Sequence, residues 1–194
     1  QRILMTSHPN TPSCMKVTIH RGSKQIGGCI TEIQSSSGTR ILIDLGHNLS
    51  GECQKEDEYD VPDNLSALLE GVSAVIYTHN HGDHLGFFEH VPESIPQYIG
   101  EMAKEVVFNA ADEIFNKAKR KGYLELIEKM QYKILRIKGF HTYETGKAFT
   151  VGDISITPFF VSHSAADAYM MLIECDGMRI LHTGDLREHG FLGK

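Results

Sequence analysis

Residues 78–86, THNHGDHLG, limit most strongly what this chain can fold into, because three histidines and one aspartate lie within six positions. The stretch follows the mostly apolar run VSAVIYT, which predicts a short buried β-strand ending at His79. With 11 histidines and, by count, 10 aspartates in 194 residues, roughly 0.002 accidental H-x-H-x-D-H matches are expected from composition. Chance therefore does not account for the pattern.

The spacing suits metal binding. Residues i and i+2 at the end of a strand project to the same side, so His79 and His81 can hold one ion. A turn at Gly82 lets Asp83 and His84 face a second ion. Imidazole and carboxylate ligands suit zinc, with manganese or iron as alternatives. The competing interpretations are a closed structural zinc site, which usually includes cysteine and finds none nearby, and a polar loop that caps a helix.

Strand patterns occupy both ends of the chain. Alternating or apolar runs bounded by turn residues predict strands and two hairpins, one with the loop SSSG and one with Asp176 and Gly177 in its turn. These runs lie at residues 15–22, 29–34, 39–46, 148–151, 154–161, 168–174 and 178–183. The order of elements indicates helices packed outside two mixed β-sheets.

The middle of the chain predicts helices. Residues 101–121 show helical spacing, with Val106, Ala110, Ile114 and Ala118 on the predicted core face and Gly122 as the stop. A second helix is predicted over residues 124–130. Residues 133–138, KILRIK, predict a further strand.

Charge and cysteine content narrow the class of protein. The net charge of −6 gives no general attraction to nucleic acid. The bases are unevenly placed: residues 117–138 carry eight bases against two acids, which we interpret as a solvated face or, alternatively, a phosphate-backbone patch. Four scattered cysteines without a C-x-x-C pair favour a reducing cytoplasm, and no apolar run is long enough to span a membrane.

Three further motifs follow in an order that resembles a known family. ILIDLG places Asp44, FFVSHS places His163 and ILHTGD places Asp185, each at the end of a predicted strand. Together with T-H-x-H-x-D-H, these stretches resemble the metallo-β-lactamase superfamily. The resemblance implies an α+β fold of the αββα type, in residues 15–194, preceded by an N-terminal extension over residues 1–14.

The resemblance also implies two divalent ions, Zn²⁺ or alternatively Mn²⁺ or Fe. One ion would be held by His79, His81 and His163. The other would be held by Asp83 and His84, with Asp185 bridging both. Asp44 would orient the ligand histidines without binding metal.

One part of the family pattern is missing from the printed sequence. The family expects another histidine well beyond the bridging aspartate, but after Asp185 only His189 remains, and it lies too close. We therefore expect a chain truncated after the fourth motif, incomplete at its C-terminus, with the second metal site one ligand short.

The implied function is metal-dependent hydrolysis, in which a metal-bound hydroxide attacks a phosphodiester and Asp83 and Asp185 position it. The stretch HSAADA, from His163, is similar to the ribonuclease J branch of β-CASP nucleases, which implies RNA as the substrate of the full-length protein and a missing C-terminal β-CASP domain. Ser164 is then a candidate phosphate contact, or simply a turn-stabilising serine.

The alternative functions are a small-molecule hydrolase of the same fold, acting on a lactone, thioester or cyclic phosphodiester, and an inactive metal-binding fragment. The oligomeric state stays open.

Overall fold

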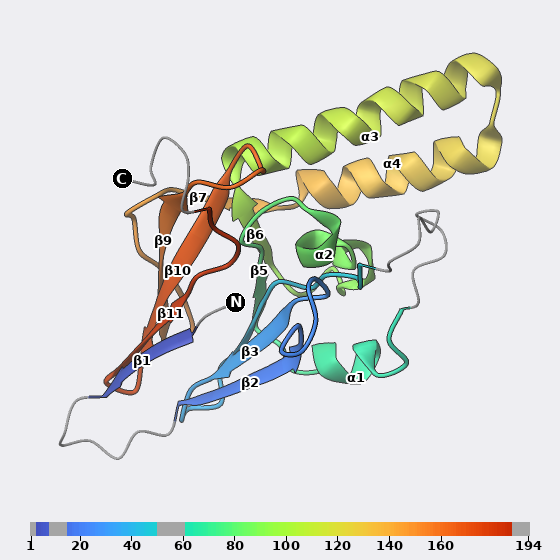
Figure 1. The fold of residues 1–194 in the computed structure, drawn as a ribbon. Coiled ribbons are helices and arrows are strands. Elements are labelled where there is room, and N and C mark those ends of the chain that lie inside the picture. Colours follow the sequence, from blue (N-terminus) through green and yellow to red (C-terminus); the bar gives the residue numbers. More distant parts are fainter. Residues whose placement is uncertain (1–2, 8–14, 50–60, 188–194) are drawn as a thin grey trace.

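Two β-sheets pack face to face, and helices cover the outer face of one of them (Figure 1). The computed structural model describes residues 3–7, 15–49 and 61–187. This arrangement confirms the predicted α+β class with helices outside two sheets. His189 lies outside the described residues.

The six-stranded sheet delivers the histidine motif. Its strands β2 to β7 follow the chain order, antiparallel from β2 to β4 and parallel from β4 to β7. The predicted hairpin with the SSSG loop and the predicted strand before His79 are confirmed as β3–β4 and β5. The bounds are β2 Lys16–Arg21, β3 Ile30–Gln34, β4 Arg40–Ile43, β5 Ala74–Ile76, β6 Gln97–Gly100 and β7 His141–Tyr143.

The five-stranded sheet is antiparallel throughout, in the order β1-β11-β10-β9-β8. The predicted β10–β11 hairpin is confirmed: Asp176 and Gly177 both have positive φ, 52° and 71°, as the tight turns that match strand twist require. Part of the predicted N-terminal extension forms β1, so the domain boundary at residue 15 stays a prediction. The bounds are β1 Ile3–Ser7, β8 Phe149–Val151, β9 Ile154–Val161, β10 Ala168–Cys175 and β11 Met178–His182.

The strands β4 and β5 are buried on both faces. Ile41, Ile43 and Ile76 point into the core between the two sheets, whereas Leu42 and Val75 point into the core beneath the helices. This alternation follows from the two-residue period of a strand. The near-continuous apolar sequence of both strands therefore reflects a central position in the fold.

The helices gather on one side. Residues from α1, α2, α3 and α4 contribute to the core beneath the six-stranded sheet. The α3–α4 hairpin projects away from both sheets (Figure 1), and α3 ends at Gly122, φ 72°, as predicted. Among the described residues, no helix has the length and apolarity needed to cross a membrane. The bounds are α1 Leu65–Leu69, α2 Gly82–Leu85, the 3-10 helix η2 Phe88–His90, α3 Glu101–Lys121 and α4 Leu124–Lys138.

The predicted strand at residues 133–138 is wrong, because α4 continues to Lys138. Met130, Ile134 and Ile137 recur at helical spacing; Met130 is buried, and Ile134 and Ile137 pack in the core between the helices and the six-stranded sheet. The local alternation of KILRIK suggested a strand, but the longer helical period through α4 determines the structure.

The predicted core face of α3 is also partly wrong. Ala118 is buried, but Val106 and Ile114 are each 40% exposed. The buried face instead carries Ala103 and Ala111. Apolar residues occupy two faces of this helix, and spacing alone does not tell which one packs inward.

We predict that Ile137→Ala lowers the free energy of unfolding by about 2–5 kcal/mol, because it empties a fully buried position. Leu135→Ala is the matched control, since Leu135 is 64% exposed, and its cost should stay within about 0.5 kcal/mol. In a strand, both residues would share a face. Chemical denaturation giving equal costs would therefore contradict the helical assignment.

Candidate metal centre

Asp44 is the buried carboxylate beneath the site. It directly follows β4 and has a left-handed backbone, φ 63°, which is strained for most residues but tolerated by aspartate. Its Oδ1 accepts hydrogen bonds from the Thr78 backbone N–H at 2.7 Å and the Thr78 hydroxyl at 3.0 Å. Its Oδ2 lies 2.7 Å from His84 Nδ1. Asp44 thus connects the end of β4 with the chain that leaves β5.

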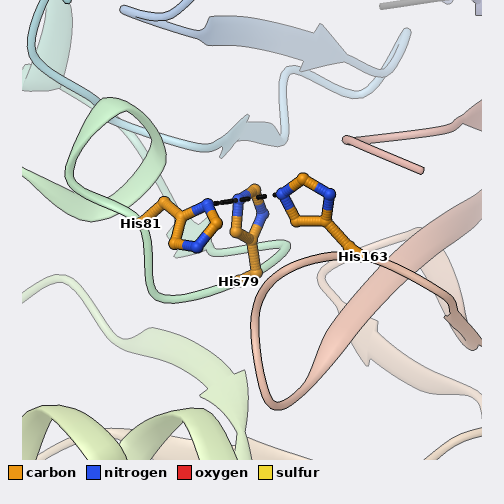
Figure 2. A group of neighbouring side chains, drawn as sticks. All are labelled: His79, His81 and His163. Atoms are coloured by element: carbon orange, nitrogen blue, oxygen red, sulfur yellow. Dashed lines mark hydrogen bonds between the residues drawn. The ribbon is translucent and has the colours of Figure 1, made fainter. Parts of the chain in front are cut away.

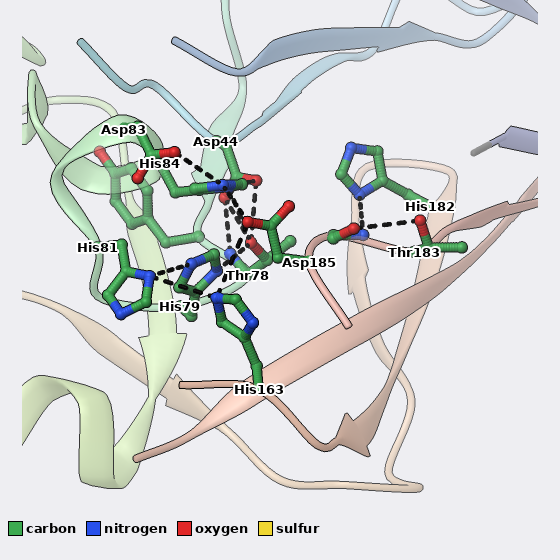
Figure 3. Close-up of polar contacts among 12 residues, drawn as sticks. Asp44, Thr78, His79, His81, Asp83, His84, His163, His182, Thr183 and Asp185 are labelled. Atoms are coloured by element: carbon green, nitrogen blue, oxygen red, sulfur yellow. Dashed lines mark hydrogen bonds and ion pairs between the residues drawn. The ribbon is translucent and has the colours of Figure 1, made fainter. Parts of the chain in front are cut away.

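These contacts orient two ring nitrogens toward the site. Asp44 occupies Nδ1 of His84, which leaves Nε2 of that ring facing outward (Figure 3). The Thr78 hydroxyl lies 3.0 Å from His79 Nδ1, leaving His79 Nε2 to face the other histidines. A partner on one imidazole nitrogen fixes the tautomer and presents the other nitrogen as a ligand. Thr78 therefore has a positioning role that the sequence analysis missed.

Three histidines converge at one point (Figure 2). His81 Nδ1 lies 3.1 Å from His79 Nε2 and 3.3 Å from His163 Nε2. Three nitrogen ligands of tetrahedral zinc, each about 2.0–2.1 Å from the ion, stand about 3.3 Å apart. The predicted set of His79, His81 and His163 is therefore brought together with separations that fit one ion.

A second group forms beside the first. His79, His84 and Asp185 present ligand atoms close to one another. Asp185 Oδ2 lies 3.5 Å from His84 Nε2 and 3.8 Å from His163 Nε2, between the two groups (Figure 3). Asp83 Oδ2 is 3.6 Å from His84 Nε2. Asp83 thus stands at the edge of the second group without completing a three-residue set.

The donor set fits a metal ion. Nε2 of His84 is buried and has no hydrogen-bond partner among the described residues, because both neighbouring carboxylates are beyond good hydrogen-bond distance. Such an unsatisfied buried nitrogen is costly unless another group binds it. Bound Zn²⁺ would satisfy this atom and the converging histidine nitrogens together.

Electrostatics keep His79 and the carboxylates in binding forms but not His84. Burial alone would lower the pKa of His84, but the charge of Asp44 and the contacts with Asp185 and Asp44 raise it well above its usual range, so this ring must lose a proton when a metal binds it. Burial, reinforced by the charge of His84, lowers the pKa of His79 to about 3, so this ring is neutral near pH 7. Burial alone would raise the pKa of Asp44, but the charge and hydrogen bond of His84 outweigh it and hold the carboxyl below its usual range. Contact with His84 lowers the pKa of Asp185. Neutral imidazole and ionised carboxylate are the forms that bind metal.

Close backbone packing holds the second group in place. A Cβ on Gly46 would stand 1.6 Å from the Asp83 carbonyl oxygen. The ring of His47 lies against α2, where a Cβ on Gly82 or Gly86 would collide with it. His47 is outside the predicted ligand set, but its ring is half-buried and lies against Gly82 and Gly86, on either side of Asp83 and His84 in the chain. Glycine at these positions is therefore required by space.

Asp167 is a second positioning residue absent from the predicted set. Its carboxylate is buried and accepts hydrogen bonds from the backbone N–H groups of Met102 at 2.9 Å and Ala103 at 3.3 Å. These groups form the first turn of α3, where unpaired donors favour a carboxylate. Asp167 thus ties the loop that carries His163 to α3. The D of HSAADA was the available signal, because it lies four residues after a predicted ligand.

Ser164 lies at the exposed edge of the site, with its Oγ 3.4 Å from His163 Nε2. His182, at the end of β11, is buried, and its Nδ1 accepts a hydrogen bond from the Gly184 backbone N–H at 3.3 Å. It lies apart from the histidine cluster (Figure 3).

Comparisons with known proteins agree with this geometry. Residues 30–194 match the metallo-beta-lactamase superfamily. Ribonuclease J of Mycobacterium tuberculosis is 24% identical over 92% of this chain and 29% of its own length. An RNase J-like protein of Methanocaldococcus jannaschii is 28% identical over 87% of this chain and 36% of its own. This chain thus spans about a third of the length of these relatives.

A solved structure shares the fold. A protein of unknown function from Enterococcus faecalis V583 aligns with a TM-score of 0.62 at 21% identity, covering 92% of this chain and 45% of that one. The fold, the order of motifs and the family match lead to one conclusion. The chain belongs to the metallo-β-lactamase superfamily, whose members are generally hydrolases that bind divalent metal.

We predict that Asp44→Asn weakens zinc binding by about 10–100-fold, because the amide no longer presents two acceptor oxygens to Thr78 and His84. Isothermal titration calorimetry measures the affinity. Asp153→Asn is the control, since Asp153 accepts a hydrogen bond from Ser35 far from the histidines. Equal zinc affinities of Asp44→Asn and Asp153→Asn would show that Asp44 does not support metal binding.

We predict that Asp167→Ala lowers the free energy of unfolding by about 0.5–2 kcal/mol, the usual cost of a lost helix cap. It should also weaken zinc binding, because the loop carrying His163 loses its anchor on α3. Asp112→Ala on the surface of α3 removes the same charge without touching that loop. A variant that lost stability but kept wild-type zinc affinity would restrict Asp167 to helix capping.

Proposed function

We propose that this chain is the metal-binding part of a hydrolase that cleaves phosphodiester bonds, with RNA as the substrate of the full-length protein. One observation supports this most directly: His79 belongs to both ligand groups, so two ions bound there would be immediate neighbours. Adjacent ions suit a displacement in which both the attacking and the leaving oxygen need stabilisation.

We propose that the site binds divalent metal, with Zn²⁺ as our first choice and Mn²⁺ or Fe as alternatives. The metal would supply a Lewis acid and a water that ionises near neutral pH. We assign His79, His81 and His163 to one ion, Asp83 and His84 to the other, and Asp185, which lies between the two groups, to both. The second set is one ligand short in our assignment. The imidazole and carboxylate donors suit these borderline metals, and the thiol of Cys29 lies within hydrogen-bonding reach of His84.

The carboxylates are assigned to proton handling. Asp185 is half-exposed and has a lowered pKa, so its ionised Oδ2 can accept a hydrogen bond from the attacking water. Asp83 lies across His84 from Asp185 and can hold the same water from the other side. Two acceptors would orient a lone pair of that water toward the substrate.

The choice of RNA rests on the relatives. Ribonuclease J and the RNase J-like protein match along most of this chain. We assign Ser164 to a phosphate contact, because its hydroxyl is exposed next to the ligand nitrogen of His163. We further propose that a β-CASP domain completes the substrate channel. Cys29 and Cys175 are free thiols, in keeping with our placement of the protein in the cytoplasm.

We predict that metal-loaded protein hydrolyses bis-p-nitrophenyl phosphate and that the full-length protein cleaves single-stranded RNA. His81→Ala should reduce both activities to background, because it removes a ligand from the three-histidine group. Release of p-nitrophenol and gel analysis of labelled RNA measure the two activities.

His90→Ala serves as the control, because His90 is exposed on η2 outside the ligand groups. Wild-type activity surviving in His81→Ala would overturn the metal mechanism. A lactone, a thioester and a cyclic phosphodiester complete the substrate panel. Turnover of one of these without RNA cleavage would favour the small-molecule hydrolase, and no turnover with zinc bound would favour a metal-binding fragment.

A further inference from the structure

Charge is sharply divided between residues 117–138, which form the end of α3 and all of α4, and the rest of the chain. Residues 117–138 carry eight bases and two acids, a net charge of +6. The other residues carry 11 bases and 23 acids, a net charge of −12, and the two values sum to the total of −6. The far end of the projecting hairpin, where α3 ends and α4 begins, together with the rest of α4, is therefore the basic part of an acidic chain (Figure 1).

The bases near the body have partners within the fold. Lys133 pairs with Glu89 at 3.3 Å. Arg136 is buried and donates to the Val91 carbonyl oxygen. On the facing helix, the Lys104 ammonium donates to the Phe140 carbonyl oxygen at 2.6 Å. These cations bind groups in η2, in the residue after it and in the residues after α4, so their presence is explained by packing at the base of the hairpin.

The bases at the far end differ. Lys117, Lys119, Arg120 and Lys121 are exposed, and no salt bridge among the described residues involves any of them. We call these four residues the basic tip. Favourable interaction with the C-terminal end of the α3 dipole accounts for part of this placement, but that interaction falls off within the last turn and does not require Lys117.

Exposed ring and apolar side chains accompany the basic tip. Tyr123 is 54% exposed and Leu124 is 73% exposed, although both could have been polar at a helix turn. The Lys121 ammonium lies 5.8 Å from the centre of the Tyr123 ring. Cations together with an accessible aromatic ring suit a nucleic-acid strand, which offers phosphates to the former and base faces to the latter.

We propose that the basic tip is a docking surface for the phosphate backbone of single-stranded RNA. The inference rests on the proposed function in taking RNA as the ligand. The helix α3 connects the two regions: its first turn is held by Asp167, beside the loop of His163, and its 21 residues span about 31 Å at 1.5 Å per residue. The tip therefore contacts RNA well away from the bond that is cut.

The test measures binding of a fluorescein-labelled 30-nucleotide single-stranded RNA by anisotropy over a range of salt concentrations. A chelator keeps the protein metal-free, so the probe stays intact. The test variant changes the four residues of the basic tip to glutamine, which preserves helix propensity. The matched control changes four exposed bases elsewhere to glutamine, at Lys16, Lys24, Lys147 and Arg179. Both variants shift the net charge from −6 to about −10.

We expect the tip variant to weaken RNA binding and to flatten the dependence of log K on log salt by about 0.7 per lost phosphate contact, up to about 2.8. The control should keep the wild-type slope, and thermal unfolding should show both variants folded. Equal weakening in both variants, unchanged binding in the tip variant, or no RNA binding by the wild type would each overturn the proposal.

Two further readouts separate this inference from the proposed function. Hydrolysis of bis-p-nitrophenyl phosphate should be unchanged in the tip variant, because the small diester does not reach the tip. Suppose that the wild type hydrolyses the diester while RNA binding is the same with and without the basic tip. That result would overturn the docking surface and would still support the proposed hydrolase. Labelled polyglutamate is a second probe. If the tip variant loses binding of polyglutamate but binds RNA as the wild type does, the basic tip instead fits an acidic protein partner.

Discussion

The buried hydrogen bonds of Asp44 are the interaction on which the rest of the site depends. A carboxylate without access to water is unfavourable unless its oxygens are fully paired, and here the Thr78 N–H, the Thr78 hydroxyl and His84 Nδ1 pair them. Because Asp44 contacts the ring of His84 directly and that of His79 through the Thr78 hydroxyl, one desolvated group sets the direction of ligands in both groups. The left-handed backbone of Asp44 is consistent with strain held at a functional position.

Much of the fold and of the ligand set could be predicted from the sequence, because both rest on local patterns. Strand alternation and glycine-containing turns located the hairpins, and the strand before His79 was apolar because β5 is buried on both faces. Ligands within one short motif are also local: His79, His81 and His84 lie close together in the chain and close together in space. His163 and Asp185 could be added only through the order of motifs in a resembling family.

The features that could not be predicted from the sequence depend on contacts between segments that lie far apart in the chain. Residues 133–138 alternate like a strand, and only packing of Ile134 and Ile137 with the rest of α4 shows a helix. The inward face of α3 follows from where the sheet lies. The role of Asp167 was missed because its partners, Met102 and Ala103, are more than sixty positions away. His47 was not predicted as part of the site, because its packing against Gly82 and Gly86 appears only in the folded chain.

The two sheets contribute different ligands, and this has a mechanical consequence. His79, His81 and His84 follow a strand of the six-stranded sheet, whereas His163 and Asp185 follow strands of the five-stranded sheet. An ion held by both sets would act as a cross-link between the sheets, at one edge of the core that they share. Separating the sheets would then require the ion to lose ligands. Metal binding would therefore stabilise the packing of the two sheets, and the rigidity of the sandwich would depend on metal occupancy.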